Sequence, residues 1–169
     1  MANRNKLMYN GDTFEFEVMD TLRVAFPDAV IIHDKRIYSH FLQQDTQIDV
    51  IMIYDGGVFV IEAKNWKGWI KGTYDDDKWT GKSSEAKVLT VFNPIHQNLI
   101  HVRTIRNALR RVGVNPPFFA NIVVFPDGAM IKSNCSEVVN LSSLVSKVKE
   151  QFNSVDKHLM QTSIMKVLS

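Results

Sequence analysis

Two runs of β-branched residues, separated by a tight turn, constrain the fold of this chain more than any other feature. Residues 47–54 and 58–65 are rich in Val and Ile, and Asp55-Gly56-Gly57 lies between them. An Asp-Gly pair between two such runs is typical of a tight β-hairpin. Both runs are apolar on both faces, so we expect two central strands that are covered on each side.

Helical periodicity flanks this hairpin in the sequence. An apolar stripe predicts a helix over residues 11–26, and Asn93-Pro94 predicts the start of a long helix that Gly113 ends. We expect further strands at residues 29–33, 118–125 and 137–140, an exposed hairpin at 69–79, and C-terminal helices near 141–152 and 155–168. Residues 34–46 are expected to form a loop or a weak strand. This order predicts an α/β (α+β) fold with a central mixed sheet, flanking helices and a C-terminal helical extension.

Size and composition exclude several classes of protein. The chain has 169 residues, of which 45% are hydrophobic and 22% charged, which suits one globular domain over residues 1–169. No apolar stretch approaches the roughly 20 residues of a membrane span, and residues 1–10 are too polar for a secretory signal. The single Cys135 excludes an internal disulfide and a multi-thiolate zinc site. We therefore expect a cytoplasmic protein without a membrane partner.

Charge is distributed unevenly along the chain. The formal net charge is only +2, but residues 1–62 contain 5 Lys/Arg against 10 Asp/Glu, and residues 63–169 contain 15 against 8. A split of this kind is typical of an acidic pocket beside a polyanion-binding surface, and it also arises by chance.

Acidic residues occupy positions where the pattern demands burial. Asp49 and Glu62 lie inside the two apolar runs. A turn at residues 55–56 would place Asp49 opposite Glu62, and a turn at residues 56–57 would place it opposite Lys64. Because side chains alternate along a strand, either register puts these three side chains on one face.

Glu15 is the third acid on an apolar face. It lies on the same helical stripe as Val18 and Leu22, so it points toward the sheet. Carboxylates opposite each other repel, and a bound cation removes the repulsion; the alternative is a buried ion pair with Lys64. Oxygen ligands favour Mg²⁺, Mn²⁺ or Ca²⁺, and Mg²⁺ beside a Lys suits phosphodiester hydrolysis.

The same acids also resemble a known signature. Asp49 followed by Glu62-Ala63-Lys64 resembles the D…(D/E)-x-K signature of the PD-(D/E)XK nuclease superfamily, and residues 11–126 look more closely like a nuclease-related (NERD) domain. Other matching residues are Gly11, Gln47, Gly68, Trp79, Asn93, Pro94, Gln97 and Asn98. Two positions depart from the pattern, because Phe14 replaces a common Gly and Ile48 replaces the namesake Pro.

This resemblance implies a restriction-endonuclease-like fold and a role for each site residue. Asp49, Glu62 and the Ala63 carbonyl would be ligands of Mg²⁺ or Mn²⁺. Lys64 would be the catalytic Lys. Glu15 would complete or position the metal site.

Basic segments are the candidates for nucleic-acid contact. Residues 64–71 combine two Trp with three Lys, among them Lys67, which suits phosphate binding and base stacking; the alternative is a hairpin whose Trp residues cover the core. The resemblance places Gln97 toward the site from the second long helix. The basic side chains of that helix, which form either a solvated face or a phosphate-binding one, are Arg103, Arg106, Arg110 and Arg111. None of the five His residues is assigned to catalysis.

Taken together, these features predict a metal-dependent nuclease that hydrolyses phosphodiester bonds in DNA. The alternative is a catalytically inactive nuclease-fold module that binds DNA or protein. We expect a homo-oligomer or a targeting partner protein to direct the chain to its substrate.

Overall fold

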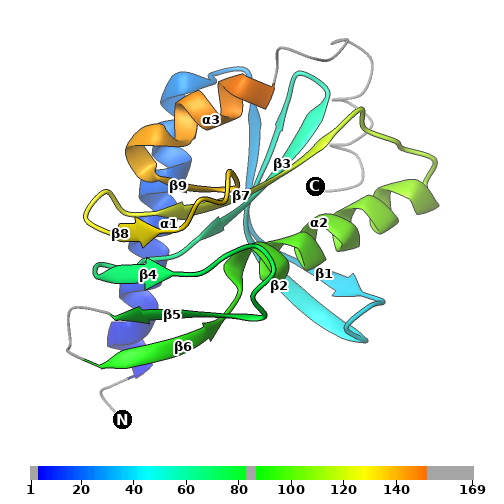
Figure 1. The fold of residues 1–169 in the computed structure, drawn as a ribbon. Helices are drawn as coiled ribbons and strands as arrows, with labels where there is room; N and C mark the ends of the chain where they lie inside the picture. The colour runs from blue at the N-terminus through cyan, green and yellow to red at the C-terminus, as the bar shows by residue number, and fades with distance from the viewer. Residues whose placement is uncertain (1–3, 83–86, 152–169) are drawn as a thin grey trace.

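A central five-stranded sheet organises the fold (Figure 1). The computed structural model describes residues 4–82 and 87–151, with side chains from residue 13 onward. The strands of this sheet, in spatial order, are β1 (Val30–Ser39), β2 (Gln44–Tyr54), β3 (Gly57–Ala63), β7 (Phe119–Phe125) and β9 (Val138–Asn140). The first three are antiparallel, and β3, β7 and β9 are parallel, so the sheet is mixed as expected.

A second sheet of four short strands lies beside the first (Figure 1). Its strands, in spatial order, are β6 (Val88–Phe92), β5 (Lys78–Lys82), β4 (Trp69–Lys71) and β8 (Met130–Lys132). The expected exposed hairpin is confirmed as β4 and β5. Strands β6 and β8 were not predicted, because their few residues are mostly exposed and show no buried apolar run.

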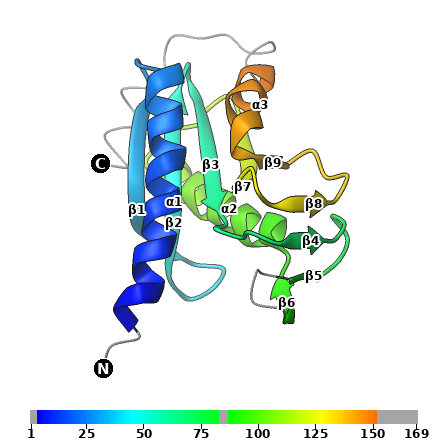
Figure 2. The same cartoon turned by 90° about the vertical axis from the view of Figure 1, so that its left-hand side faces the viewer.

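Helices cover both faces of the central sheet (Figure 2). On one face, α1 (Arg4–Ala25) and α3 (Leu144–Glu150), the latter preceded by a 3₁₀ turn at Leu141–Ser143, pack on side chains such as Val50 and Ile61. On the other face, α2 (Pro94–Arg111) packs on Ile51 and Val60. The predicted mixed α+β fold is therefore confirmed. None of the described helices has the length and apolar character needed to cross a bilayer.

The tight turn sets the register of the central hairpin. Tyr54 pairs with Gly57, which is the first of the two expected registers. Asp55 and Gly56 have φ angles of 53° and 81°, as a type I′ turn requires. Gly57 is needed for a different reason, because a Cβ there would lie 2.1 Å from the ring of Phe118.

The sequence signals at both ends of α2 are confirmed. Asn93 caps the helix, and its Oδ1 accepts a hydrogen bond from the Ile95 N–H at 2.9 Å. Gly113 follows the last turn with φ of 77°, a conformation that favours glycine. The apolar stripe ends before Val112, whose side chain is exposed.

The structure corrects one sequence-based boundary and decides a second. Helix α1 begins at Arg4 and not at residue 11, because residues 4–10 contain no Gly or Pro that would end a helix. For residues 34–46 the strand alternative is confirmed over most of the segment, because β1 continues to Ser39 and β2 begins at Gln44. The helix expected near residues 155–168 lies outside the described residues.

A change of face inside β1 and β2 explains why the end of β1 was missed. Ile31 packs on the α1 side, but Ile37 packs on the α2 side, although both positions are odd-numbered. The change occurs at Asp34, which has a φ of 51°. In β2, Ile48 and Val50 likewise pack on opposite faces. Asp49 therefore lies where β2 changes face.

Candidate functional site

Glu62 forms the centre of a buried polar cluster at the end of β3. Its side chain is 3% exposed and points toward α2. Its Oε1 accepts hydrogen bonds from Lys64 Nζ at 2.6 Å and from Gln97 Nε2 at 2.8 Å. Lys64 Nζ also donates to Gln97 Oε1 at 3.0 Å, so the three side chains form a closed triangle.

His101 contributes a fourth side chain that sequence reasoning excluded. Its Nδ1 lies 3.3 Å from Glu62 Oε2, and both atoms are buried without a hydrogen bond of good geometry. Helical spacing could have indicated this contact. His101 follows Gln97 by four residues and so lies on the same face of α2. Burial alone would raise the pKa of Glu62, but the contacts from His101 and Lys64 outweigh burial and hold that pKa below its usual value.

Asp49 lies beside this cluster, at the point where β2 and β3 separate. The paired ladder ends at Val50 and Ile61, and Asp49 Oδ2 accepts the Ala63 N–H at 2.9 Å. Burial, followed by the negative charge of Glu62, raises the pKa of Asp49 to about 7. The structure therefore brings together two carboxylates that repel each other.

Glu15 reaches the same region from the opposite side of the sheet. Its charge also contributes to the raised pKa of Asp49, as expected for a nearby acid. Its own carboxylate contacts His33, with Glu15 Oε2 2.6 Å from Nε2. His33 was not predicted as its partner, because the partner lies on another element, 18 residues away.

Neighbouring amides position α2 against the strands that form the site. Asn98 Nδ2 donates to the carbonyl oxygens of Val60 at 2.8 Å and Ile122 at 3.1 Å, on β3 and β7. Asn121 Nδ2 donates to the Ile95 carbonyl at 3.0 Å. These bonds fix the height of α2 above the sheet and thereby the position of Gln97.

The basic side chains predicted to contact nucleic acid occupy two separate places. Lys67 is exposed in the segment that follows β3. At 1.5 Å per residue, Arg103 and Arg110 lie about 9 and 20 Å from Gln97 along the axis of α2. Arg103 and Arg110 are exposed, whereas Arg106 stacks on Phe119 with its Cζ 4.8 Å from the ring centre.

The tryptophan in the basic segment has a structural role. Trp66 Nε1 is 3.2 Å from both the Trp69 and the Lys82 carbonyl oxygens, and its ring lies against Gly81. This contact joins the end of β3 to the second sheet. The expected alternative, in which a Trp covers the core, therefore holds for Trp66.

The donor set fits a hard divalent cation with two side-chain ligands. Within residues 4–82 and 87–151, no three His, Cys, Asp or Glu side chains are grouped as a metal site. The side-chain oxygens available to a cation here are those of Asp49 and Glu62, and Ala63, whose N–H donates to Asp49, follows Glu62 in the chain. The repulsion that raises the pKa of Asp49, and the buried Glu62 Oε2 without a hydrogen bond, are the features that a cation would relieve.

Comparison with known proteins points to one family. A family model described as nuclease-related domain matches residues 10–126, which is more than half of the chain. An uncharacterized protein of Bacillus anthracis is 39% identical over 75 residues, which cover 44% of this chain and 34% of that protein. The chain thus matches about a third of the length of this relative. No solved structure matches the chain.

Proposed function

The chain belongs to the nuclease-related domain family, and on this premise we propose that it is a Mg²⁺- or Mn²⁺-dependent nuclease that hydrolyses phosphodiester bonds in DNA. The observation that carries the proposal is the pair of mutually repelling carboxylates, Asp49 and Glu62, beside the Lys64 ammonium. Two carboxylates and a lysine, gathered where β2 and β3 separate, can supply the ligands and the cationic group for metal-assisted hydrolysis.

In this mechanism Asp49 and Glu62, with the Ala63 carbonyl, would bind the metal ion. The bound ion would neutralise charge on the reacting phosphate and acidify a water molecule. Lys64 Nζ, which Gln97 holds at 3.0 Å, orients the attacking water or stabilises the charge that develops on phosphate oxygen. Glu15, paired with His33, acts as a positioning residue that keeps negative charge near Asp49.

Substrate contacts in this proposal extend from the site along α2. Lys67 would bind a phosphate next to the cleaved one. Arg103 and Arg110 would bind phosphates further along the backbone, since they lie about 9 and 20 Å from Gln97. A cytoplasmic location, a homo-oligomer and a targeting partner protein remain predictions.

The proposal is tested by nuclease assays with purified protein, labelled DNA and Mg²⁺. We expect Glu62→Gln and Lys64→Ala to lower the cleavage rate by about a hundredfold or more, because each removes a group that acts on the reacting atoms. Glu17→Gln and Lys149→Ala are the matched controls, since both side chains are exposed and Glu17 lies on the opposite side of α1 from Glu15. Equal rates in wild type, Glu62→Gln and Lys64→Ala would refute the mechanism.

One observation favours the second candidate, a nuclease-fold DNA-binding module without catalysis. Glu62 is already contacted by Lys64, Gln97 and His101, so its carboxylate is compensated without a metal. Calorimetric titration with Mn²⁺ separates the two candidates. The nuclease predicts binding that is lost in Asp49→Asn, and the inactive module predicts no binding in either protein.

A further inference from the structure

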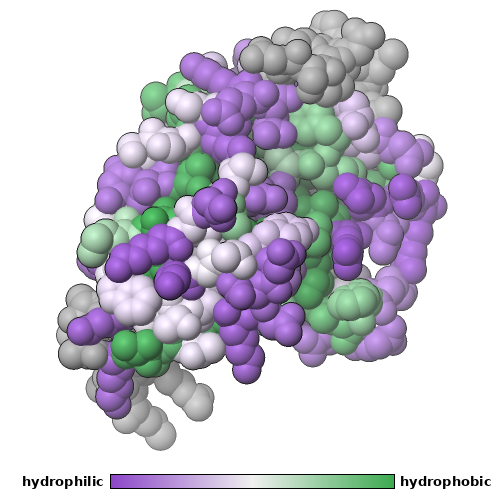
Figure 3. All heavy atoms as spheres, viewed as in Figure 1, coloured by the Kyte–Doolittle hydropathy of each residue, from purple (hydrophilic) through white to green (hydrophobic). Residues whose placement is uncertain are grey.

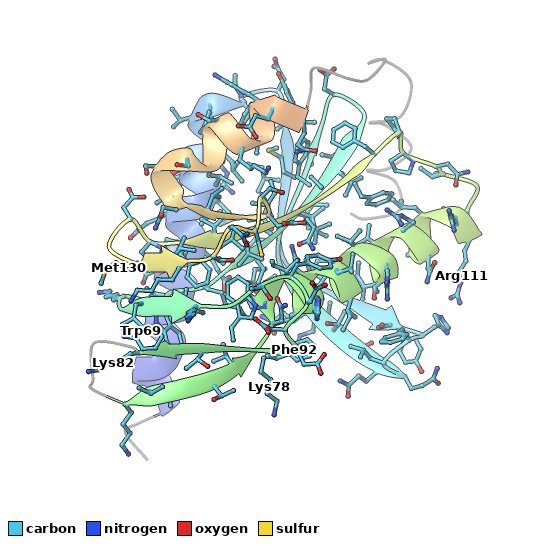
Figure 4. The ribbon with its side chains drawn as sticks, viewed as in Figure 1. Trp69, Lys78, Lys82, Phe92, Arg111 and Met130 are labelled. Carbon is cyan, nitrogen blue, oxygen red and sulfur yellow. The ribbon has the colours of Figure 1, made fainter. Side chains whose placement is uncertain are left out.

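The outward face of the four-stranded sheet combines lysines with exposed apolar side chains. Alternate residues of β4, β5, β6 and β8 point away from the core, and we call the surface they form the sheet face. Its lysines are Lys71, Lys78, Lys82 and Lys132. No Asp or Glu occurs in any of the four strands. Figure 4 shows side chains of this face, including Lys78 and Lys82, far from Arg111 at the end of α2.

The strand register places like charges next to each other on the sheet face. Lys71 pairs directly with Lys132 across β4 and β8. Two lysines in directly opposite positions repel each other and weaken the sheet. A polyanion that bridges them would convert this repulsion into attraction, which indicates a ligand with repeated negative charges.

Apolar side chains lie between the lysines on the sheet face. Phe92 is 49% exposed and Met130 is 61% exposed, although large apolar side chains of this kind are usually buried. Trp69 pairs with Met130, and Lys132 Nζ lies 5.2 Å from the centre of the Trp69 ring. Hydrophilic and hydrophobic residues lie side by side on this face of the molecule (Figure 3).

The sheet face is hollowed and is bounded at one end. A cavity of about 680 Å³ lies over Trp69, Lys71, Lys78 and Lys132. The turn between β4 and β5 closes this end with three aspartates at residues 75–77. Asp76 in this turn accepts hydrogen bonds from Thr73 N and Oγ1 at 2.7 and 2.9 Å, so it is held at the rim. A polyanion would therefore lie across the strands, away from the acidic turn.

Phe92 connects the sheet face to the site at Glu62. A small cavity of about 120 Å³ is lined by Phe92 together with Lys64 and Gln97. Lys64 and Gln97 are the side chains that hydrogen-bond to Glu62. The same cavity is also lined by Ile70 and Val91 on the inward side of the sheet, so Phe92, the last residue of β6, marks the edge at which a strand leaving the sheet face would turn toward the reacting groups.

We propose that the sheet face binds one strand of single-stranded DNA and leads it to the site at Glu62, an inference that rests on the proposed function for its choice of ligand. Four strands at about 4.8 Å spacing give a surface roughly 14 Å across, which suits a single strand. A duplex would leave Phe92 and Met130 without apolar contacts, because its base faces are stacked inside. A single strand presents phosphates to the lysines and base faces to the apolar side chains.

The first test removes two lysines and measures binding without cleavage. Fluorescence anisotropy in EDTA follows labelled oligothymidylate bound to the full chain over a range of salt concentrations. We expect Lys71→Ala/Lys132→Ala to reduce the slope of log K against log salt by about 1.4, since each phosphate contact to a single strand contributes about 0.7. The control Arg36→Ala/Lys149→Ala removes the same charge from exposed positions elsewhere and should keep the wild-type slope. An equal slope in both double variants would overturn the proposal.

The second test concerns stacking. Phe92→Leu should weaken binding of oligothymidylate by roughly fivefold or more and leave an abasic strand of equal length unaffected. An equal loss with both strands, or no loss with either, would contradict a base contact at Phe92. Salt-dependent binding of oligothymidylate by a wild-type protein that does not cleave it in Mg²⁺ would count against the proposed function alone, whereas absence of the lysine effect counts against this inference.

Discussion

At the residue scale, Asp49 shows how burial and a like charge act on one carboxyl group. Its pKa is raised to about 7, first by burial and then by the charge of Glu62. An unfolded Asp has a pKa of about 3.9, so the folded protein binds more protons between about pH 4 and pH 7. The free energy of unfolding therefore falls as pH rises through this window, and the ionised Asp49 opposes folding at pH 8.

Replacing Asp49 tests this account directly. In EDTA at pH 8, we expect Asp49→Asn to raise the free energy of unfolding by about 1–3 kcal/mol, because it removes a repelling charge and keeps an acceptor for the Ala63 N–H. The gain should disappear by about pH 4. Urea unfolding across this pH range measures it, with the exposed Asp20→Asn as control. A stabilisation that is independent of pH would contradict the assigned cause.

His101 is the residue whose role depends most on the packing of α2. It lies 3.3 Å from Glu62 Oε2 and helps to hold the pKa of Glu62 low. We expect His101→Gln to raise that pKa and to shift the acid limb of the pH–rate profile to higher pH. His96→Gln is the control on the same helix. A lower cleavage rate with an unchanged pH–rate profile would show that His101 contributes only by packing.

At the element scale, Asn93 joins α2 to the turn between β4 and β5 through one side chain. Its Oδ1 caps α2, and its Nδ2 donates to the carbonyl oxygens of Thr73, Tyr74 and Asp76 in the turn between β4 and β5. The backbone N–H of Asn93 also donates to the Asp77 carbonyl at 3.0 Å. The start of α2, where Gln97 lies, is therefore tied to the second sheet.

Substitution of this residue should cost more than loss of a helix cap. We expect Asn93→Ala to lower the free energy of unfolding by about 2–4 kcal/mol, since it removes the cap together with the hydrogen bonds from Nδ2 to the turn. Asn107→Ala, at an exposed position within α2, should change stability little. Chemical unfolding of the two variants makes the comparison. A similar, small loss in both would show that the contacts to the turn carry no energy.

At the scale of the whole molecule, cation binding and folding are coupled. If Asp49 and Glu62 bind Mg²⁺ in the folded chain and not in the unfolded one, a concentration of 100 times Kd should raise the free energy of unfolding by about 2.7 kcal/mol. Asp49→Asn/Glu62→Gln should show no Mg²⁺ effect. Thermal unfolding with and without Mg²⁺ provides the measurement, and NaCl at the same ionic strength distinguishes site binding from screening. A shift of equal size in the double variant would place the ion elsewhere.

The uneven distribution of charge along the chain corresponds to separate regions of the folded molecule. Three of the ten acids in residues 1–62 lie around the site, namely Glu15, Asp49 and Glu62. Lysines from the later part of the chain gather on the sheet face, and arginines follow α2. The excess of positive charge is thus divided between two surfaces, the sheet face and the arginine-bearing part of α2.

The sequence by itself determined the elements whose signals are local. The Asp55-Gly56-Gly57 run predicted the hairpin and limited it to two registers, and Asn93-Pro94 with Gly113 set the ends of α2, because left-handed turns and caps depend on neighbouring residues. Apolar patterning also identified β3 and β7 as buried strands. Membership of the nuclease-related family followed from residues in these same elements.

Only the tertiary structure decided how the polar groups meet. The change of face at Asp34 and Asp49 breaks the alternation on which strand reasoning depends, so the turn of Asp49 toward the Ala63 N–H was hidden from the sequence. The contact between His101 and Glu62 joins residues 39 positions apart, as the packing of α2 on β3 dictates. The sheet face arises from β8 pairing with β4 across nearly 60 residues of chain, and no local signal specifies such a pairing because its free energy comes from contacts made after the chain has folded.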